Sequence, residues 1–221
     1  MDQGPDQGYL PEPGKYIFIP DKPDEKEATK SNLNYVDGRR YLWAFLGPND
    51  EIYEWVRPKA EALSQGVRTL AKTVNRYPQS AYAILGMLLQ IKWKYLQRNV
   101  PGIGSLMGPI EDSIRYDLLP ALFGGEEVSA NLIEILGHSV KVGGLGIPYP
   151  RLSSECVYNT SNAAIKVLLG SLLGGTDLNY VAHKGCIRRS RSDGRKHREL
   201  AEKAALTRRK ELADGEGLNH P

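Results

Sequence analysis

Basic and aromatic side chains alternate over a short stretch near the middle of the chain, a combination suited to nucleic acid. The stretch contains Lys92, Trp93, Lys94, Tyr95 and Arg98. Cationic side chains bind backbone phosphates, and aromatic rings offer faces on which bases stack. The alternative is that Trp93 packs into a core while the lysines are solvated, and for Trp93 itself we slightly favour that alternative.

A second concentration of positive charge lies near the C-terminus. Residues 184–210 carry eleven basic and three acidic side chains, so the segment has a net charge of +8, whereas the whole chain has +3. Such a segment creates a local positive potential suited to phosphate backbones. The alternative is a solvated helix with surplus cations, supported by i,i+4 pairs such as Arg195–Glu199. The candidate phosphate-binding residues are Arg188, Arg189, Arg191, Arg195 and Lys196.

Residue patterns typical of enzymes are scarce. The neighbours Glu111 and Asp112 point about 100° apart on a helix, and we expect both to face outward with Arg115. Gly143-Gly144-Leu145-Gly146 lacks the Gly-Lys-Ser/Thr ending of a phosphate-binding loop, so we interpret it as a tight turn. Spacing alone therefore predicts no catalytic site.

Residues that bind metals are equally sparse. The pair His183-x-x-Cys186 could supply two zinc ligands, but a site needs three or four ligands and Cys156 is the one other cysteine. The four histidines fit no metal-binding spacing. We therefore expect no metal site in this chain and no cofactor bound by it.

Composition and hydropathy exclude several classes of protein. Two cysteines in 221 residues argue against a secreted disulfide scaffold and for a reducing compartment. The longest apolar run, residues 81–89, is far shorter than the ~20 residues that cross a bilayer. Residues 1–6 are acidic and have no apolar core, unlike a signal peptide. We expect a soluble, intracellular protein, in nucleus or cytoplasm, with no membrane partner.

Apolar periodicity predicts a mainly α fold, a helical bundle with a short N-terminal β-hairpin. Runs at 15–19 and 40–46 are β-prone and bounded by turn signals. From residue 50, apolar positions recur at helical spacing as far as Tyr77. The next helix, about 79–98, has a first half that is apolar nearly all round, so we expect that half to be buried. Further helices are expected at about 107–120, 127–136 and 152–173, with a basic helix from Asp177 interrupted at Gly185 and Gly194.

Several short motifs follow one another in a distinctive order. Gly8-Tyr9-Leu10-Pro11-Glu12-Pro13-Gly14-Lys15 precedes Gly38-Arg39-Arg40-Tyr41-Leu42, and Trp93-x-Tyr95-Leu96-x-Arg98 comes later. Pro109-Ile110-Glu111-Asp112-x-x-Arg115, Leu119-Pro120-Ala121-Leu122-Phe123-Gly124 and Gly143-Gly144-Leu145-Gly146-Ile147-Pro148 follow. Each motif is weak alone, but the ordered set, over roughly residues 8 to 200, resembles the C-terminal part of eukaryotic retrotransposon reverse transcriptases.

The resemblance implies a role for each part of the chain. Lys15 would take the place of a palm lysine that assists nucleotidyl transfer, and the hairpin at 41–47 would be a primer grip. Residues Arg39, Arg40, Tyr41 and Trp43 would then contact nucleic acid, with template–primer RNA or DNA as the partner. The implied segments are an irregular N-terminus at 1–14, a palm-like remnant with the hairpin at 15–48, a helical thumb-like domain at 49–176 and a partly disordered basic helical tail at 177–221.

The sequence also departs from that family. The family's polymerase centre holds two Mg²⁺ ions on aspartates that include a Tyr-x-Asp-Asp strand, and no such motif precedes Gly8. Tyr16 replaces the usual serine, while Trp43 and Ala44 replace hairpin glycines. We expect a reverse-transcriptase-like retroelement fragment that binds template–primer nucleic acid, cannot polymerise alone, and has the missing palm and fingers as a further partner. The alternatives are a non-enzymatic helical interaction module and a decayed relic with no nucleic-acid role.

Overall fold

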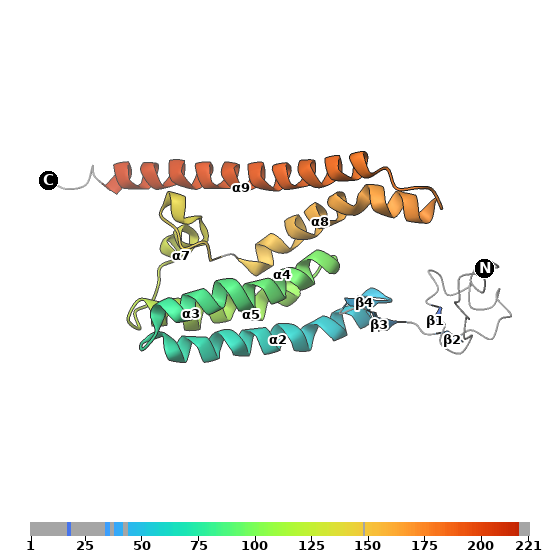
Figure 1. The fold of residues 1–221 in the computed structure, drawn as a ribbon. Coiled ribbons are helices and arrows are strands. Elements are labelled where there is room, and N and C mark those ends of the chain that lie inside the picture. Colours follow the sequence, from blue (N-terminus) through green and yellow to red (C-terminus); the bar gives the residue numbers. More distant parts are fainter. Residues whose placement is uncertain (1–16, 19–33, 36–37, 42–43, 148, 217–221) are drawn as a thin grey trace. The chain divides into compact units, whose positions relative to one another are not determined.

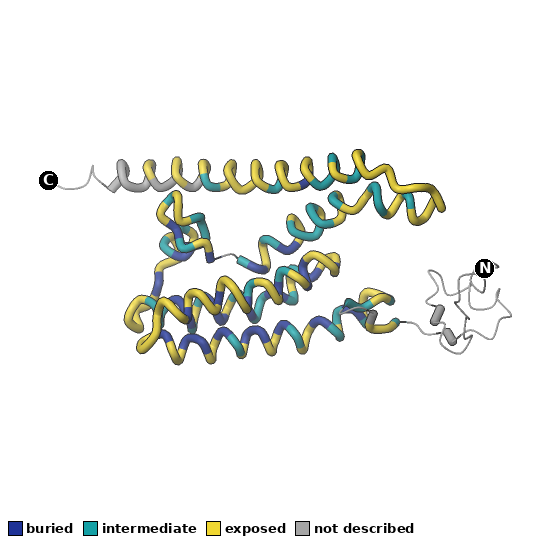
Figure 2. The backbone as a smooth tube through the Cα atoms, in the orientation of Figure 1, coloured by how far each residue is buried: buried dark blue, intermediate teal, exposed yellow. Residues whose placement is uncertain are grey.

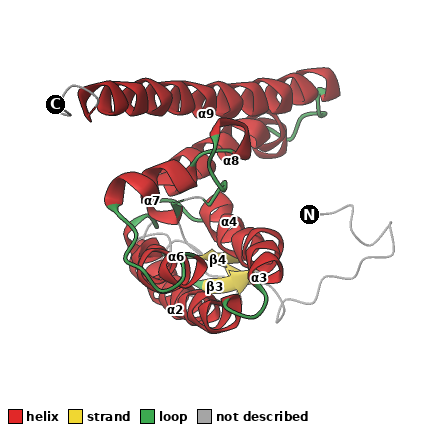
Figure 3. Cartoon of the chain, turned by 90° about the vertical axis from the view of Figure 1, so that its left-hand side faces the viewer, coloured by secondary structure: helices red, strands yellow, loops and turns green. Residues whose placement is uncertain are grey.

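The computed structural model describes residues 17–18, 34–35, 38–41, 44–147 and 149–216. The chain divides into two compact units, residues 1–55 and 56–221, whereas the sequence suggested a boundary at residue 48. Helices make up most of the described chain, with a small antiparallel hairpin near the N-terminus (Figure 3), which confirms the mainly α fold. In the described residues, no helix combines the length and apolar character needed to span a membrane.

The first unit contains two short strand pairs. Strand β1 (Ile17–Phe18) pairs in parallel with β2 (Asn34–Tyr35), and β3 (Arg39–Tyr41) pairs with β4 (Ala44–Leu46) as an antiparallel hairpin. The β-prone run at 40–46 is therefore shared between two strands. The rings of Phe45 and Trp55 have centroids 6.0 Å apart, so the hairpin contacts the first turns of helix α2 (Asn49–Val74).

Helix α2 buries the apolar stripe that its sequence predicts. One face of the helix is buried along most of its length (Figure 2), and the buried residues include Ala60, Leu63, Val67, Leu70 and Val74. Tyr77, which the periodicity placed on the same stripe, is 52% exposed because the helix ends before it, at Val74. The buried Ser64 Oγ donates a hydrogen bond to the carbonyl oxygen of Pro109, 2.9 Å away.

The second long helix is built from α3 (Pro78–Ile84), a π-helical turn η3 (Leu85–Leu89) and α4 (Gln90–Asn99). Leu85, Leu89 and Trp93 are buried along one face. The expectation that its first half is buried all round was wrong, because the helix packs along one face and leaves the opposite face open. On that open face Met87 is 75% exposed, and Ile84, Leu88 and Ile91 are also exposed.

The chain continues through η4 (Ser105–Met107), α5 (Gly108–Ser113), the π-helical η5 (Ile114–Leu118) and α6 (Leu119–Leu122). The four apolar residues that predicted a helix here, Met107, Ile110, Ile114 and Leu118, are all buried. Helix α7 (Ala130–Gly137) begins three residues later than expected because Ser129 caps it: the Ser129 Oγ accepts a hydrogen bond from the Leu132 amide at 3.3 Å.

Helices α8 (Pro150–Leu173) and α9 (Tyr180–Glu216) lie side by side and run in opposite directions (Figure 1). The predicted interruptions of α9 at Gly185 and Gly194 were wrong, since the helix passes through both glycines. Instead, small residues of α9 face α8: the Ser190 hydroxyl donates to the Thr160 carbonyl oxygen at 2.5 Å, and Gly194 lies against Thr160. The basic segment belongs to the second unit, in which α9 packs on α8.

Candidate nucleic-acid interface

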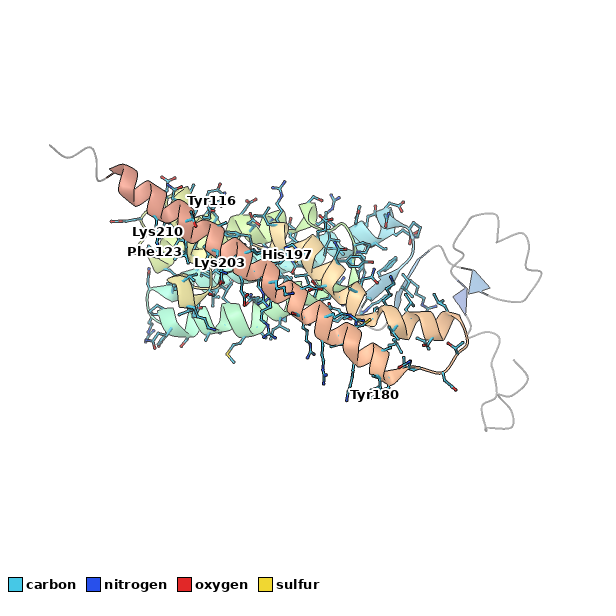
Figure 4. All side chains as sticks on the ribbon, turned by 90° about the horizontal axis from the view of Figure 1, so that it is seen from above. Tyr116, Phe123, Tyr180, His197, Lys203 and Lys210 are labelled. Carbon is cyan, nitrogen blue, oxygen red and sulfur yellow. The ribbon has the colours of Figure 1, made fainter. Side chains whose placement is uncertain are left out.

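Five cations of α9 lie on one side of the helix. Residues spaced alternately by four and three positions share a face, because an α-helix has 3.6 residues per turn. The five residues are exposed and span 14 positions, which is about 21 Å along the axis at 1.5 Å per residue. Figure 4 shows α9 as an unbroken helix from Tyr180 to Lys210. We call these residues, Lys184, Arg188, Arg191, Arg195 and Arg198, the basic stripe.

Three further cations of α9 occupy the other side of the helix. Arg189, Lys196 and Lys203 are exposed and lie between the basic stripe and the face that packs on α8. Helix α9 thus has three faces: its small residues that pack on α8, the basic stripe, and a second set of cations. Of the cations predicted from composition, Arg188, Arg191 and Arg195 share the stripe, whereas Arg189 and Lys196 do not.

One end of the basic stripe lies within electrostatic range of Lys94 on α4. Lys94 is half-buried, and its pKa is lowered from the ordinary value of 10.5 by burial first, and then by the charges of Arg98 and Arg198. The charge of Arg198 thus acts on Lys94, although 104 positions separate the two residues in the chain. Lys92 and Arg98 are exposed on the same helix. The structure therefore brings together two basic segments that the sequence presents separately.

Arg198 and Lys184 are functional candidates that composition did not single out. Their signal was present in the sequence, because they extend the four-and-three spacing of Arg188, Arg191 and Arg195 in both directions. That spacing becomes meaningful once α9 is known to be continuous, since an interruption at Gly185 or Gly194 would rotate the two ends relative to each other.

The aromatic part of the predicted site is divided between core and surface. Trp93 is fully buried, so it is a core residue and offers no face to a base. Gln97, one turn later, is also buried and donates from Nε2 to the Pro150 carbonyl oxygen at 2.6 Å and to Ser154 Oγ at 3.0 Å. These contacts hold α4 against the start of α8. Tyr95 is 39% exposed, so it is the partly accessible ring of this stretch.

The candidates from the N-terminal part belong to the first unit. Arg39 and Arg40 are exposed on β3, and Arg39 lies opposite Leu46 in the hairpin. Tyr41 completes that strand. Lys15 and Trp43 lie outside the described residues, as does the side chain of Tyr41.

The pair Glu111 and Arg115, expected to face outward, has a structural role instead. The Glu111 Oε2 accepts a hydrogen bond from the Arg151 amide at 3.1 Å, so this carboxylate satisfies an unpaired donor in the first turn of α8. Arg115 Nη2 lies 3.9 Å from Glu111 Oε1, and both residues are half-buried. Asp112 is exposed, as expected.

The glycine-rich loop is a tight turn and has no amide free for phosphate. Each amide from Gly143 to Ile147 donates to a backbone carbonyl of residues 136–140. A Cβ on Gly144 would lie 2.1 Å from the His138 carbonyl oxygen, so glycine is required there. Gly143 and Gly146 have φ of 86° and 64°, a left-handed conformation that also favours glycine. The Tyr82 hydroxyl, which donates to the Leu145 carbonyl oxygen, anchors the loop to α3.

The described residues do not fit the Mg²⁺ ions that the resemblance implies for an intact polymerase. Among those residues, no group of three or more His, Cys, Asp or Glu side chains is placed to hold a metal ion. His183 and Cys186 lie on α9 without a third ligand from the described part of the chain. We therefore assign no metal site here.

No family model, curated protein or solved structure matches this chain. A line of guanidinium and ammonium groups about 21 Å long can bind a series of phosphates on a nucleic-acid backbone.

Proposed function

We propose that this chain binds template–primer nucleic acid, a duplex of RNA or DNA, through the phosphate backbone. The observation that supports the proposal is the basic stripe on α9, whose last residue, Arg198, acts electrostatically on Lys94 of α4. In the described residues, no salt bridge pairs a stripe cation with a carboxylate. These charges are therefore available to an anionic partner.

The number of cations sets the expected strength and salt dependence. Each phosphate contact with duplex DNA contributes about −0.9 to the slope of log K against log salt concentration. The five stripe residues together with Lys94 and Arg98 would give a slope of about −6 if all of them contact phosphates. The surface offers little to read bases, since Trp93 is buried. We therefore expect binding that depends on duplex charge and shape more than on sequence.

The experiment compares two variants that lose the same charge. The stripe variant carries Arg188→Gln, Arg191→Gln and Arg195→Gln, and the control carries Arg57→Gln, Lys72→Gln and Lys141→Gln, which are exposed residues outside α4 and α9. Affinity for a 20-base-pair RNA–DNA hybrid is measured by fluorescence anisotropy over a range of salt. The stripe variant should lose about 500-fold at 0.1 M salt, and the control little. Equal losses, or undetectable binding by the wild-type chain at low salt, would contradict the proposal.

We expect no polymerase activity from this chain alone. Its sequence has no Tyr-x-Asp-Asp motif, and the described residues have no carboxylate cluster for the metal ions of in-line phosphoryl transfer. The test is primer extension on an RNA template with Mg²⁺ and all four deoxynucleotides. Any template-directed extension by the pure chain would show that this part of the proposal is wrong.

A second candidate function is a non-enzymatic interaction module that contacts another protein. One observation favours it: Ile84, Met87, Leu88 and Ile91 form an exposed apolar stripe on the α3–α4 helix. Exposed apolar patches commonly mark interaction surfaces. The two candidates separate in the hybrid experiment, because an interaction module would bind the hybrid no more weakly after the stripe cations are replaced.

A further inference from the structure

Two serines lie within the basic segment Arg188-Arg189-Ser190-Arg191-Ser192, and the structure gives them opposite environments. Ser190 is 7% exposed, and its hydroxyl donates to the Thr160 carbonyl oxygen of α8 at 2.5 Å. Ser192 is exposed, because it lies about 200° around the helix from Ser190. In the closed helix the Ser192 side chain is therefore accessible to solvent and the Ser190 side chain is not.

Ser192 is surrounded by cations on its own helix. Residues three and four positions away are the nearest helical neighbours of a side chain, at about 5–6 Å between Cβ atoms. For Ser192 all four of these neighbours are basic: Arg188 and Arg189 in the turn before, and Arg195 and Lys196 in the turn after. We call these four residues the Ser192 cage.

Few opposing charges offset the cage. Asp193 points about 100° away from Ser192 around the helix, and Glu199 lies about 10 Å further along. Each of these two carboxylates is three or four positions from two cage cations, so the four cations face two opposing charges. In the described residues, no salt bridge pairs a cage cation with a carboxylate. Arg189 donates from Nη2 to the Cys186 Sγ at 3.4 Å, a weak contact that a phosphate would replace.

We propose that Ser192 is a phosphorylation site for an arginine-directed protein kinase, and that the phosphate reduces nucleic-acid binding by the surrounding cations. The second half rests on the proposed function. In the reaction, the Ser192 Oγ attacks the γ-phosphorus of ATP and an Oγ–P bond forms. The bond from the γ-phosphorus to the bridging oxygen breaks, ADP leaves, and the hydroxyl proton passes to a base of the kinase.

The sequence around Ser192 and the local helix both suit a kinase. Arginines occupy the positions one, three and four residues before the serine, a charge pattern that acidic subsites of a kinase can recognise. A kinase binds an extended segment, so α9 must open locally. Gly194 favours that opening, because glycine has a lower helix propensity than alanine.

The expected effect of the phosphate follows from its charge. A phosphoserine carries about −1.5 to −2 charges at pH 7 and three strong acceptor oxygens, so it would engage about two cage cations. The net charge of residues 184–210 would fall from +8 to about +6. If the phosphate engages Arg188 and Arg195, the two cage residues that belong to the basic stripe, the loss of their two phosphate contacts at about 0.9 log units each corresponds to about 60-fold weaker binding at 0.1 M salt.

The first arm of the test maps the modification. The full chain is incubated with ATP and an arginine-directed serine kinase, and the phosphate is located by mass spectrometry. We expect modification at Ser192, its loss in Ser192→Ala and its retention in Ser190→Ala. Absence of phosphate, or its location at another residue, would overturn the proposed site.

The second arm tests, in the absence of nucleic acid, whether the cage cations lower the pKa of the phosphate on Ser192. In a ³¹P NMR titration, the phosphate pKa should be lower in the folded chain than in urea. Arg195→Gln with Lys196→Gln removes half of the cage and keeps the arginines before Ser192, so it should raise that pKa. Lys72→Gln with Lys141→Gln, a matched loss of charge elsewhere, should not. Equal phosphate pKa values in the folded and unfolded chains would show that the cage cations do not act on the phosphate.

The third arm compares hybrid binding by the phosphorylated and unmodified chains. A loss of affinity of about 60-fold at 0.1 M salt, with a shallower salt slope, supports the proposal that phosphorylation reduces nucleic-acid binding. Unchanged affinity after modification at Ser192 would overturn the proposed effect of the phosphate on binding. If the unmodified chain does not bind the hybrid, the proposed function and the proposed effect of the phosphate on binding both fail. The first two arms still decide whether Ser192 is the modification site and whether the cage cations act on its phosphate.

Discussion

Replacing Gly185 and Gly194 by alanine tests whether α9 is one continuous helix, on which the alignment of the basic stripe depends. A Cβ added at Gly194 would lie 3.6 Å from Thr160 Cγ2 and Oγ1, and one added at Gly185 would lie 3.8 Å from Arg189 Nη1. Both distances are ordinary van der Waals contacts. Neither glycine has the positive φ that would strain an alanine. Alanine therefore fits at both positions without displacing a neighbour.

The expected gain comes from the helix propensity of the two residues. Alanine is more favourable than glycine in a helix interior by about 0.8–1.0 kcal/mol. The two sites are nine positions, about 13 Å, apart along the helix, so their effects should add to about 2 kcal/mol. For a chain of this length that corresponds to about 4–8 °C in melting temperature.

Urea unfolding followed by circular dichroism at 222 nm measures the change. We expect a higher midpoint with an unchanged slope for the Gly185→Ala/Gly194→Ala variant. The control is Gly144→Ala, whose Cβ would lie 2.1 Å from the His138 carbonyl oxygen and which should lower the midpoint. A double variant that is less stable than the wild type, or that loses helical signal, would show that α9 bends at these glycines, and the stripe would then not exist as a single face.

Three further predictions follow from packing and titration. Trp93→Ala should lower the free energy of unfolding by about 3–5 kcal/mol in urea unfolding, because Trp93 is fully buried; a surface position would lose little. Glu111→Ala should cost about 1 kcal/mol, since the Arg151 amide of α8 loses its acceptor. Burial raises the pKa of Tyr149 to about 12, and its hydroxyl donates to the Ile133 carbonyl oxygen. The unfolded chain loses this proton first, near pH 10, so this contribution to stability is complete below pH 10 and declines as the pH rises towards 12. The Tyr149→Phe variant, measured over the same pH range, should lack that decline.

The sequence predicted the helices well where a single apolar stripe determines them. The spacing of Met107, Ile110, Ile114 and Leu118 corresponds to a row of buried side chains, and α8 lies close to its expected bounds. Helix starts were less accurate where a cap decides them. Ser129 begins α7 through a side-chain hydrogen bond that apolar periodicity does not report.

The sequence failed where the environment of a residue depends on another element. Met87 and Ile91 are exposed although their segment is apolar, because no sequence pattern states on how many sides a helix is packed. The sequence predicts that Gly194 interrupts the helix, but Thr160 of α8 lies against Gly194 and the helix continues. The electrostatic effect of Arg198 on Lys94 could not be predicted either, since it depends on the packing of segments about 100 positions apart.

The most direct test of the central claim, that α4 and α9 form one phosphate-binding surface, is the salt dependence of a variant changed on α4 alone. Affinity for the RNA–DNA hybrid is measured against salt for Lys94→Gln/Arg98→Gln and for the matched control Arg57→Gln/Lys72→Gln. We expect the slope of log K against log salt concentration to be about 2 smaller in magnitude for the α4 variant than for the wild type, and unchanged for the control. Equal slopes for the wild type and the α4 variant would contradict the claim.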